Sequence, residues 1–198
     1  MARIFFIAVF ASLNIFTSSA FGFNTYQVGE VVKGRAYNKV WKQWFTKQLV
    51  LRVGIDEKGT EYLLFEAETG LGPASTLMEY DPKMTKLFQV VTSKAIKWSK
   101  VAKKNKADTS KPILCIGAKC TKRSNVFMEG KLDMSFFSAN GGKQTDLIVE
   151  IIDRGNQFIT STLYVDPSGM RTLLNNVSRI DATFEKARKT QSKQALFK

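Results

Sequence analysis

The chain has 198 residues and contains no histidine. Without histidine there is no Ser-His-Asp or Cys-His nucleophilic system, no imidazole acid–base catalyst and no histidine-containing zinc, copper or iron site. The G-x-S-x-G motif and the glycine-rich nucleotide-binding loops are absent as well. An enzyme would therefore need paired carboxylates, a Ser–Lys pair or a thiol. The sequence predicts a non-enzymatic protein without a cofactor or metal.

Long hydrophobic runs are also missing, except at the N-terminus. Arg3 precedes an apolar segment from Ile4 to Phe16, and small residues follow it with the spacing of a cleavage site. The segment is shorter than the roughly 20 residues that cross a bilayer. We therefore expect residues 1–22 to be a cleaved signal peptide, and the protein to be exported to the periplasm or extracellular space without a transmembrane segment.

Cysteine is scarce, and its two copies, Cys115 and Cys120, lie close together. An exported chain keeps such a pair oxidised, so we predict a structural disulfide. A redox-active pair is the alternative, but it usually has two intervening residues and a helix N-terminus that lowers the pKa of one thiol. Two thiols alone also fall short of the four ligands of a structural zinc site.

The remaining chain reads as one α+β domain over residues 23–190, followed by a flexible basic tail at 191–198. Alternating hydrophobicity and turn residues predict antiparallel hairpins and a C-terminal three-stranded meander, with Asn140-Gly141 as the strongest turn signal. The expected strands are 28–33, 49–55, 61–68, 87–91, 125–138, 144–153 and 157–165, with a loop over 70–82 and a short apolar run after Pro112.

Helical spacing of apolar residues predicts three helices. The first lies within 36–49, where a strand is the alternative because aromatic residues also favour sheets. The second begins at Thr92 or Ser93 and is rich in lysine. The third follows Asp166 and Pro167, an acidic cap with proline in the first turn, and packs on the sheet.

Residues 93–123 hold ten basic residues and a single acid, Asp108. The lysines of the expected helix lie opposite its small apolar face, so we interpret them as a solvent-facing surface. Lysine suits a diffuse anionic surface, whereas nucleic-acid readers interleave arginine and aromatic residues. The candidate contact residues are Lys94, Lys97, Lys100, Lys103, Lys104, Lys119, Lys122 and Arg123.

Residues 54–81 have the opposite character, with seven acids against Lys58 alone. The acidic and basic segments either neutralise each other or mark two separate faces. Glu66 and Glu68 alternate along one expected strand. They raise the alternative of a small carboxylate-dependent hydrolase that acts on cell-envelope glycan.

A second candidate surface is aromatic. Its spacing favours a core position, and the alternative is an exposed platform for sugars or a protein interface. The residues are Trp41, Trp44 and Phe45, among Lys39, Lys42 and Lys47.

The leading hypothesis is an exported binding or accessory module. It would contact an anionic envelope component or an acidic exported protein through its lysine-rich surface.

Overall fold

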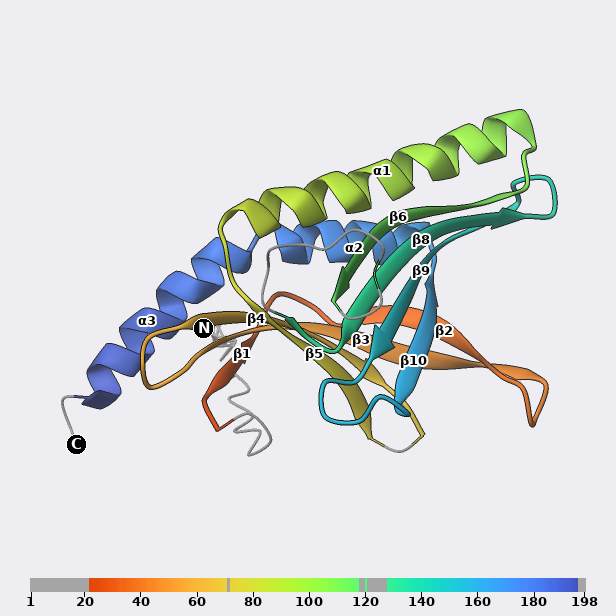
Figure 1. Cartoon of the computed structure of the whole chain (residues 1–198). Helices are drawn as coiled ribbons and strands as arrows, with labels where there is room; N and C mark the ends of the chain where they lie inside the picture. Colours follow the sequence, from red (N-terminus) through yellow and green to blue (C-terminus); the bar gives the residue numbers. More distant parts are fainter. Residues whose placement is uncertain (1–21, 71, 118–119, 121–127, 196–198) are drawn as a thin grey trace, which may run out of the picture.

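A strongly curved antiparallel sheet forms the body of the protein, and helices cover one of its faces (Figure 1). The computed structural model describes residues 22–70, 72–117, 120 and 128–195. The expected signal peptide therefore lies almost entirely outside the described residues, as do Lys119, Lys122 and Arg123.

The sheet has ten strands in the described part, in the order β6-β8-β9-β10-β2-β3-β4-β5-β7, with β1 paired to β3. Every pairing is antiparallel. The strands are β1 (Thr25–Gln27), β2 (Val32–Asn38), β3 (Gln43–Ile55), β4 (Glu61–Glu68), β5 (Pro73–Glu79), β6 (Thr109–Gly117), β7 (Met128–Glu129), β8 (Lys131–Ala139), β9 (Gln144–Ile152) and β10 (Thr160–Val165).

The curl of the sheet brings its two ends together. Only Gly130 separates β7, which pairs with β5, from β8 at the opposite side of the sheet. Gly130 has a φ of 86°, and a side chain there would lie 2.6 Å from the carbonyl oxygen of Ile152. A residue without a Cβ is therefore required where the sheet closes.

Three helices lie on the concave side of the sheet: α1 (Lys83–Asn105), α2 (Pro167–Val177) and α3 (Ile180–Ala195). The helix α1 crosses the sheet beside α2, and α3 packs on β3 and β1. Alternate strand residues face these helices and form one hydrophobic core. The ring of Phe65 on β4 meets that of Phe88 on α1, with centroids 5.0 Å apart.

The predicted class, a single α+β domain with hairpins, a meander, a middle helix and a C-terminal helix, is confirmed. The Asp166 side chain caps α2 by accepting from the Gly169 N–H at 2.8 Å, with Pro167 in the first turn. The third predicted helix, which follows Asp166 and Pro167, is in fact two helices, because α2 ends at Val177 and α3 begins at Ile180. The expected tail at 191–198 is helical as far as Ala195.

The prediction of a helix within 36–49 is wrong. These residues form the hairpin of β2 and β3, in register from Val32 opposite Leu49 to Asn38 opposite Gln43. The aromatic residues satisfy helical spacing by coincidence, and β-sheet propensity prevails. The expected strand at 28–33 is also wrong in its first half, which turns at Gly29 (φ 67°) between β1 and β2.

Two further predictions are corrected around α1. Residues 87–91 belong to this helix rather than to a strand, because α1 begins at Lys83 and its buried positions Met84 and Phe88 continue the helical spacing of Ala95. The expected loop at 70–82 contains β5. Its central residues, Ala74–Met78, are buried on both faces and so lack the polar alternation of a half-exposed strand.

The strand β6, which lies at one end of the sheet, is irregular. Pro112 interrupts β6, and the register with β8 shifts between Pro112 and Leu114. Farther along, Cys115 forms a disulfide with Cys120, with Cα atoms 5.7 Å apart. This bond is compatible with an exported protein.

Candidate binding surface

The outer face of α1 is rich in lysine. The helix carries seven lysines and no acidic residue, and all seven side chains are exposed. None of them forms an ion pair within the described part of the chain. We call this set the lysine ridge: Lys83, Lys86, Lys94, Lys97, Lys100, Lys103 and Lys104.

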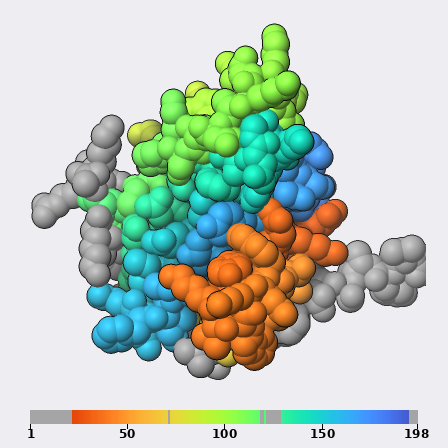
Figure 2. Space-filling model, turned by 90° about the vertical axis from the view of Figure 1, so that its right-hand side faces the viewer, coloured from red at the N-terminus to blue at the C-terminus, as the bar shows by residue number. Residues whose placement is uncertain are grey.

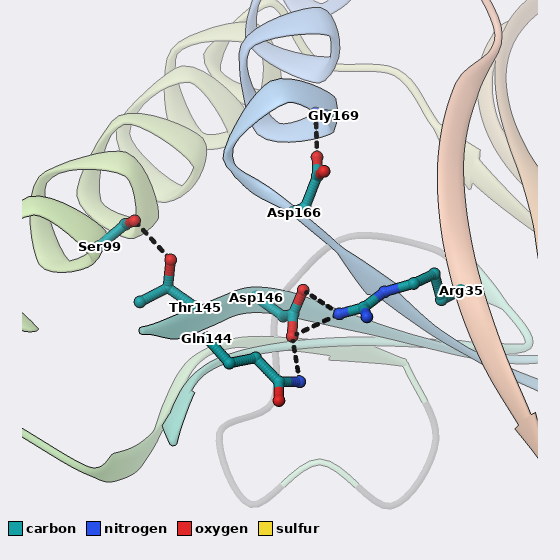
Figure 3. Close-up of polar contacts among 7 residues, drawn as sticks. All are labelled: Arg35, Ser99, Gln144, Thr145, Asp146, Asp166 and Gly169. Atoms are coloured by element: carbon teal, nitrogen blue, oxygen red, sulfur yellow. Dashed lines mark hydrogen bonds and ion pairs between the residues drawn. The ribbon is translucent and has the colours of Figure 1, made fainter. Parts of the chain in front are cut away.

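The opposite face of α1 sets this orientation. Met84, Phe88, Ala95 and Ala102 are buried against the sheet. Ser99 is buried too, and its hydroxyl lies 2.7 Å from that of Thr145 on β9 (Figure 3). Because both hydroxyls are buried, this hydrogen bond fixes the rotation of α1 and keeps its lysines directed outward.

The C-terminal end of α1 rests on the β8–β9 turn. Asp108 accepts hydrogen bonds from the N–H groups of Gly141 and Gly142 at 2.7 and 3.2 Å. A Cβ on Gly142 would lie 2.3 Å from the Ala102 carbonyl oxygen, so only glycine permits this approach. The ridge therefore ends beside Lys143, and Lys103 and Lys143 line one cavity of about 400 Å³.

The acids of residues 54–81 do not neutralise the lysine ridge. Three of them pair with cations on other elements, and Asp56 accepts from backbone N–H groups in its own turn. These three acids are therefore paired with cations other than those of the lysine ridge. The pairs are Glu61 with Arg188, Glu66 with Arg52, and Glu68 with Lys47.

Glu66 and Glu68, the two carboxylates of the hydrolase alternative, each lie beside a cation. Glu66 lies 2.6 Å from the Arg52 guanidinium, and Glu68 lies 3.6 Å from the Lys47 ammonium. Neither carboxylate lines the cavities around Arg35 or beside Trp98. The arrangement is that of two ion pairs on a strand face.

A second cluster lies on the sheet face that the helices leave uncovered. Asp146 on β9 is 1% exposed and accepts two hydrogen bonds from Arg35 on β2, each 3.2 Å long (Figure 3). Gln144 donates to the same carboxylate at 2.9 Å. Arg35 in turn lies over the ring of Trp44, 5.3 Å from its centroid. The buried carboxylate thus positions a cation that supports an exposed aromatic residue.

Open cavities of about 390 and 400 Å³ flank Arg35. Their linings mix charges of both signs, with Lys33 and Lys103 near Asp166. Asp166 is already engaged as the cap of α2. Arg35, Lys103 and Lys143 line the cavity of about 400 Å³ together with the carboxylates of Asp146 and Asp166.

The aromatic residues of the β2–β3 hairpin are exposed, so the expectation of a core position is wrong. Trp41 is 66% exposed and Trp44 46% exposed, whereas Phe45 is half-buried against Trp41. The structure adds Tyr37 and Val40, at 46% and 84% exposure. We call these four exposed residues the aromatic tip: Tyr37, Val40, Trp41 and Trp44.

The aromatic tip and the end of the lysine ridge lie on the same side of the molecule. Figure 1 shows the β2–β3 hairpin, the β8–β9 turn and the C-terminal end of α1 together at the right. Seen from that side, the three elements occupy one face of the space-filling view (Figure 2). Sequence reasoning identified Trp41, Trp44 and five ridge lysines, but it gave no sign that the two surfaces lie on the same side of the molecule.

The groups with shifted pKa values lie elsewhere, in structural contacts. Burial and a hydrogen bond to Asp181 raise the pKa of Tyr80 to about 12. Burial lowers the pKa of Lys131, but hydrogen bonds and ion pairs with Glu150 and Asp133 outweigh it and raise the value overall. These shifts report contacts between elements rather than a reactive cleft.

Within the described residues, no group of three or more Cys, Asp or Glu side chains has the geometry of a metal site. Nor is any helix of the described part both long and apolar enough to cross a bilayer.

Comparisons of the chain with protein-family models, with curated proteins and with solved structures find no significant match.

Proposed function

We propose that the protein is a non-catalytic binding module that attaches to an anionic surface through the lysine ridge. One observation carries the proposal: seven exposed lysines share one helix with no acid and no ion-pair partner in the described residues. Their mutual repulsion is relieved when an anionic partner lies against them. The disulfide is compatible with an exported setting, where anionic envelope components and acidic exported proteins are the available partners.

The test is retention of the full-length protein on heparin, on phosphatidylglycerol-containing vesicles and on peptidoglycan across a salt series. We expect retention that falls with salt. Each lysine near an anionic lipid surface contributes about 1 kcal/mol. Changing Lys97, Lys100, Lys103 and Lys104 to Glu should therefore weaken binding by more than about a hundredfold.

A matched control changes the net charge equally at another place. Lys58, Lys186, Lys189 and Lys193 are exposed and lie outside the ridge, on the β3–β4 turn and on α3. Their reversal to Glu should leave most of the binding intact. Equal losses in the two variants would show that only net charge matters and would defeat the assignment to the ridge.

A further inference from the structure

The β2–β3 hairpin combines apolar exposure with positive charge. Val40 and Trp41 at its turn are 84% and 66% exposed. Lys39 and Lys42 flank them, and both are exposed. The sequence holds no acid between Glu30 and Asp56, so the whole hairpin is cationic.

At the turn of the hairpin, two backbone N–H groups have an internal hydrogen-bond acceptor. The Asn38 side chain accepts hydrogen bonds from the N–H groups of Val40 and Trp41, at 2.9 and 3.1 Å. These two backbone donors are therefore satisfied without water, which removes a main cost of moving a turn into an apolar medium.

The hairpin is also held in place. The ring of Trp44 meets that of Tyr164 on β10 edge-on, with centroids 5.0 Å apart. Arg35, fixed by the buried Asp146, lies over the same indole. The apolar turn is thus presented by an ordered base, so little conformational freedom is lost on docking.

The ring geometry favours a bilayer over a glycan. Tyr37 and Trp44 are tilted by 57° and Trp44 and Tyr164 by 89°, so these rings do not form one flat platform on which several sugar rings could stack. Valine at the most exposed position adds nothing to stacking. Tryptophan at the lipid–water interface, an aliphatic residue below it and lysines at the headgroups are the arrangement of interfacial anchors.

We infer that the protein docks on an anionic phospholipid bilayer, with Val40 and Trp41 entering the interface and Lys39 and Lys42 at the headgroups. The inference rests on the proposed function and names its partner. Lys103 and Lys104 belong to the last turn of α1, and that end of the helix lies on the same side of the molecule as the hairpin (Figure 1).

The first test reads insertion directly from tryptophan fluorescence. The chain has three tryptophans. Changing Trp44 and Trp98 to Phe leaves Trp41 alone, and changing Trp41 and Trp44 to Phe leaves Trp98, which lies half-buried on α1, as the matched control. Vesicles of phosphatidylglycerol and phosphatidylcholine with brominated acyl chains should quench Trp41 and leave Trp98 unchanged.

The second test compares two pairs of exposed apolar residues in the full-length protein. Val40→Ala with Trp41→Ala should weaken vesicle binding by about tenfold, because apolar area no longer enters the interface. Leu87→Ala with Val90→Ala, on the first half of α1 and away from the hairpin (Figure 1), is the control. It keeps every lysine of the ridge and should change binding by less than about twofold. Circular dichroism verifies that both variants are folded.

The outcomes separate this inference from the proposed function. Vesicle binding without quenching of Trp41 overturns the inference and leaves attachment by the ridge standing. Retention on heparin or peptidoglycan without binding to vesicles also overturns it, in favour of a polysaccharide. The absence of retention on every anionic probe defeats both proposals.

Discussion

Asp146 is almost fully buried, although it is charged and lies on the sheet face that the helices leave uncovered. Its partner Arg35 is different, because 45% of the Arg35 side chain is exposed. Arg35 and Asp146 therefore differ in their access to water when the ion pair is broken. The arginine can be hydrated, whereas the carboxylate cannot.

This asymmetry makes a prediction. Arg35→Met leaves a buried carboxylate without its cation, and we expect it to lower the free energy of unfolding by about 3 kcal/mol. Asp146→Asn leaves a half-exposed guanidinium and keeps an acceptor for Gln144, so its cost should be about 1 kcal/mol. Urea unfolding of both variants measures the difference. A larger loss in Asp146→Asn would contradict the buried position of the carboxylate.

Tyr80 supports a pH-dependent prediction. Its hydroxyl contacts Asp181 on α3 and lies 2.7 Å from the Thr85 hydroxyl on α1. Because burial and Asp181 raise its pKa from 10.0 to about 12, the folded state favours the neutral phenol. The resulting stabilisation is present below pH 10 and is lost as the pH rises from about 10 through about 12.

The absorbance of tyrosinate in an alkaline titration measures this behaviour. The component that titrates near pH 12 should disappear in Tyr80→Phe. In Asp181→Asn the same component should move to lower pH, because a carboxylate that opposes ionisation is gone. An unchanged titration curve in Tyr80→Phe would assign the late component to another residue.

At the scale of elements, the lysine ridge is a single helix with two unequal ends. Its first turns lie near α3, whereas its last turns lie beside the β8–β9 turn, on the same side of the molecule as the hairpin (Figure 1). If the membrane lies against the hairpin, the two ends have different distances to the headgroups. Electrostatic attraction falls within a Debye length, about 8 Å at physiological salt.

We therefore expect the two ends of α1 to contribute unequally to vesicle binding. Lys103→Glu with Lys104→Glu should weaken binding at least about tenfold, from about 1 kcal/mol per lysine near the surface. Lys83→Glu with Lys86→Glu carries the same charge change and should have a smaller effect. Equal effects at both ends would indicate that α1 lies flat on the surface, with the hairpin directed away from it.

The sequence predicts correctly those elements that depend on residues close together in the chain. The β8–β9 hairpin follows from Asn140-Gly141, and the start of α2 follows from Asp166 and Pro167. The aromatic residues of the β2–β3 hairpin have helical spacing, so the sequence predicts a helix there; the strand is decided by pairing with β4, β1 and β10.

The candidate site was predictable only in part. The lysines of α1 stand out in the sequence because their helical spacing is local. The Arg35–Asp146 pair joins residues 111 positions apart, and its burial depends on the curvature of the whole sheet. The exposure of Trp41 likewise depends on how far the hairpin extends beyond its neighbours, which no local pattern records.

At the scale of the whole molecule, positive and negative side chains are unevenly distributed. The formal net charge is +13, and Glu61, Glu66 and Glu68 are paired with cations outside the lysine ridge. The lysines of the ridge therefore keep a positive charge that no ion pair offsets within the described residues. Such a distribution orients a protein as it approaches an anionic surface, before any contact forms.

The irregularity of β6 affects how neighbouring copies could pair if the protein is attached to a membrane. A protein held on a membrane is concentrated in two dimensions, where neighbouring copies meet side by side and exposed sheet edges tend to pair. Pro112 has no N–H, and the register shift beside it breaks the regular spacing of β6. The strand β6, which ends the sheet at one side, is thus a poor template for pairing with a neighbouring chain.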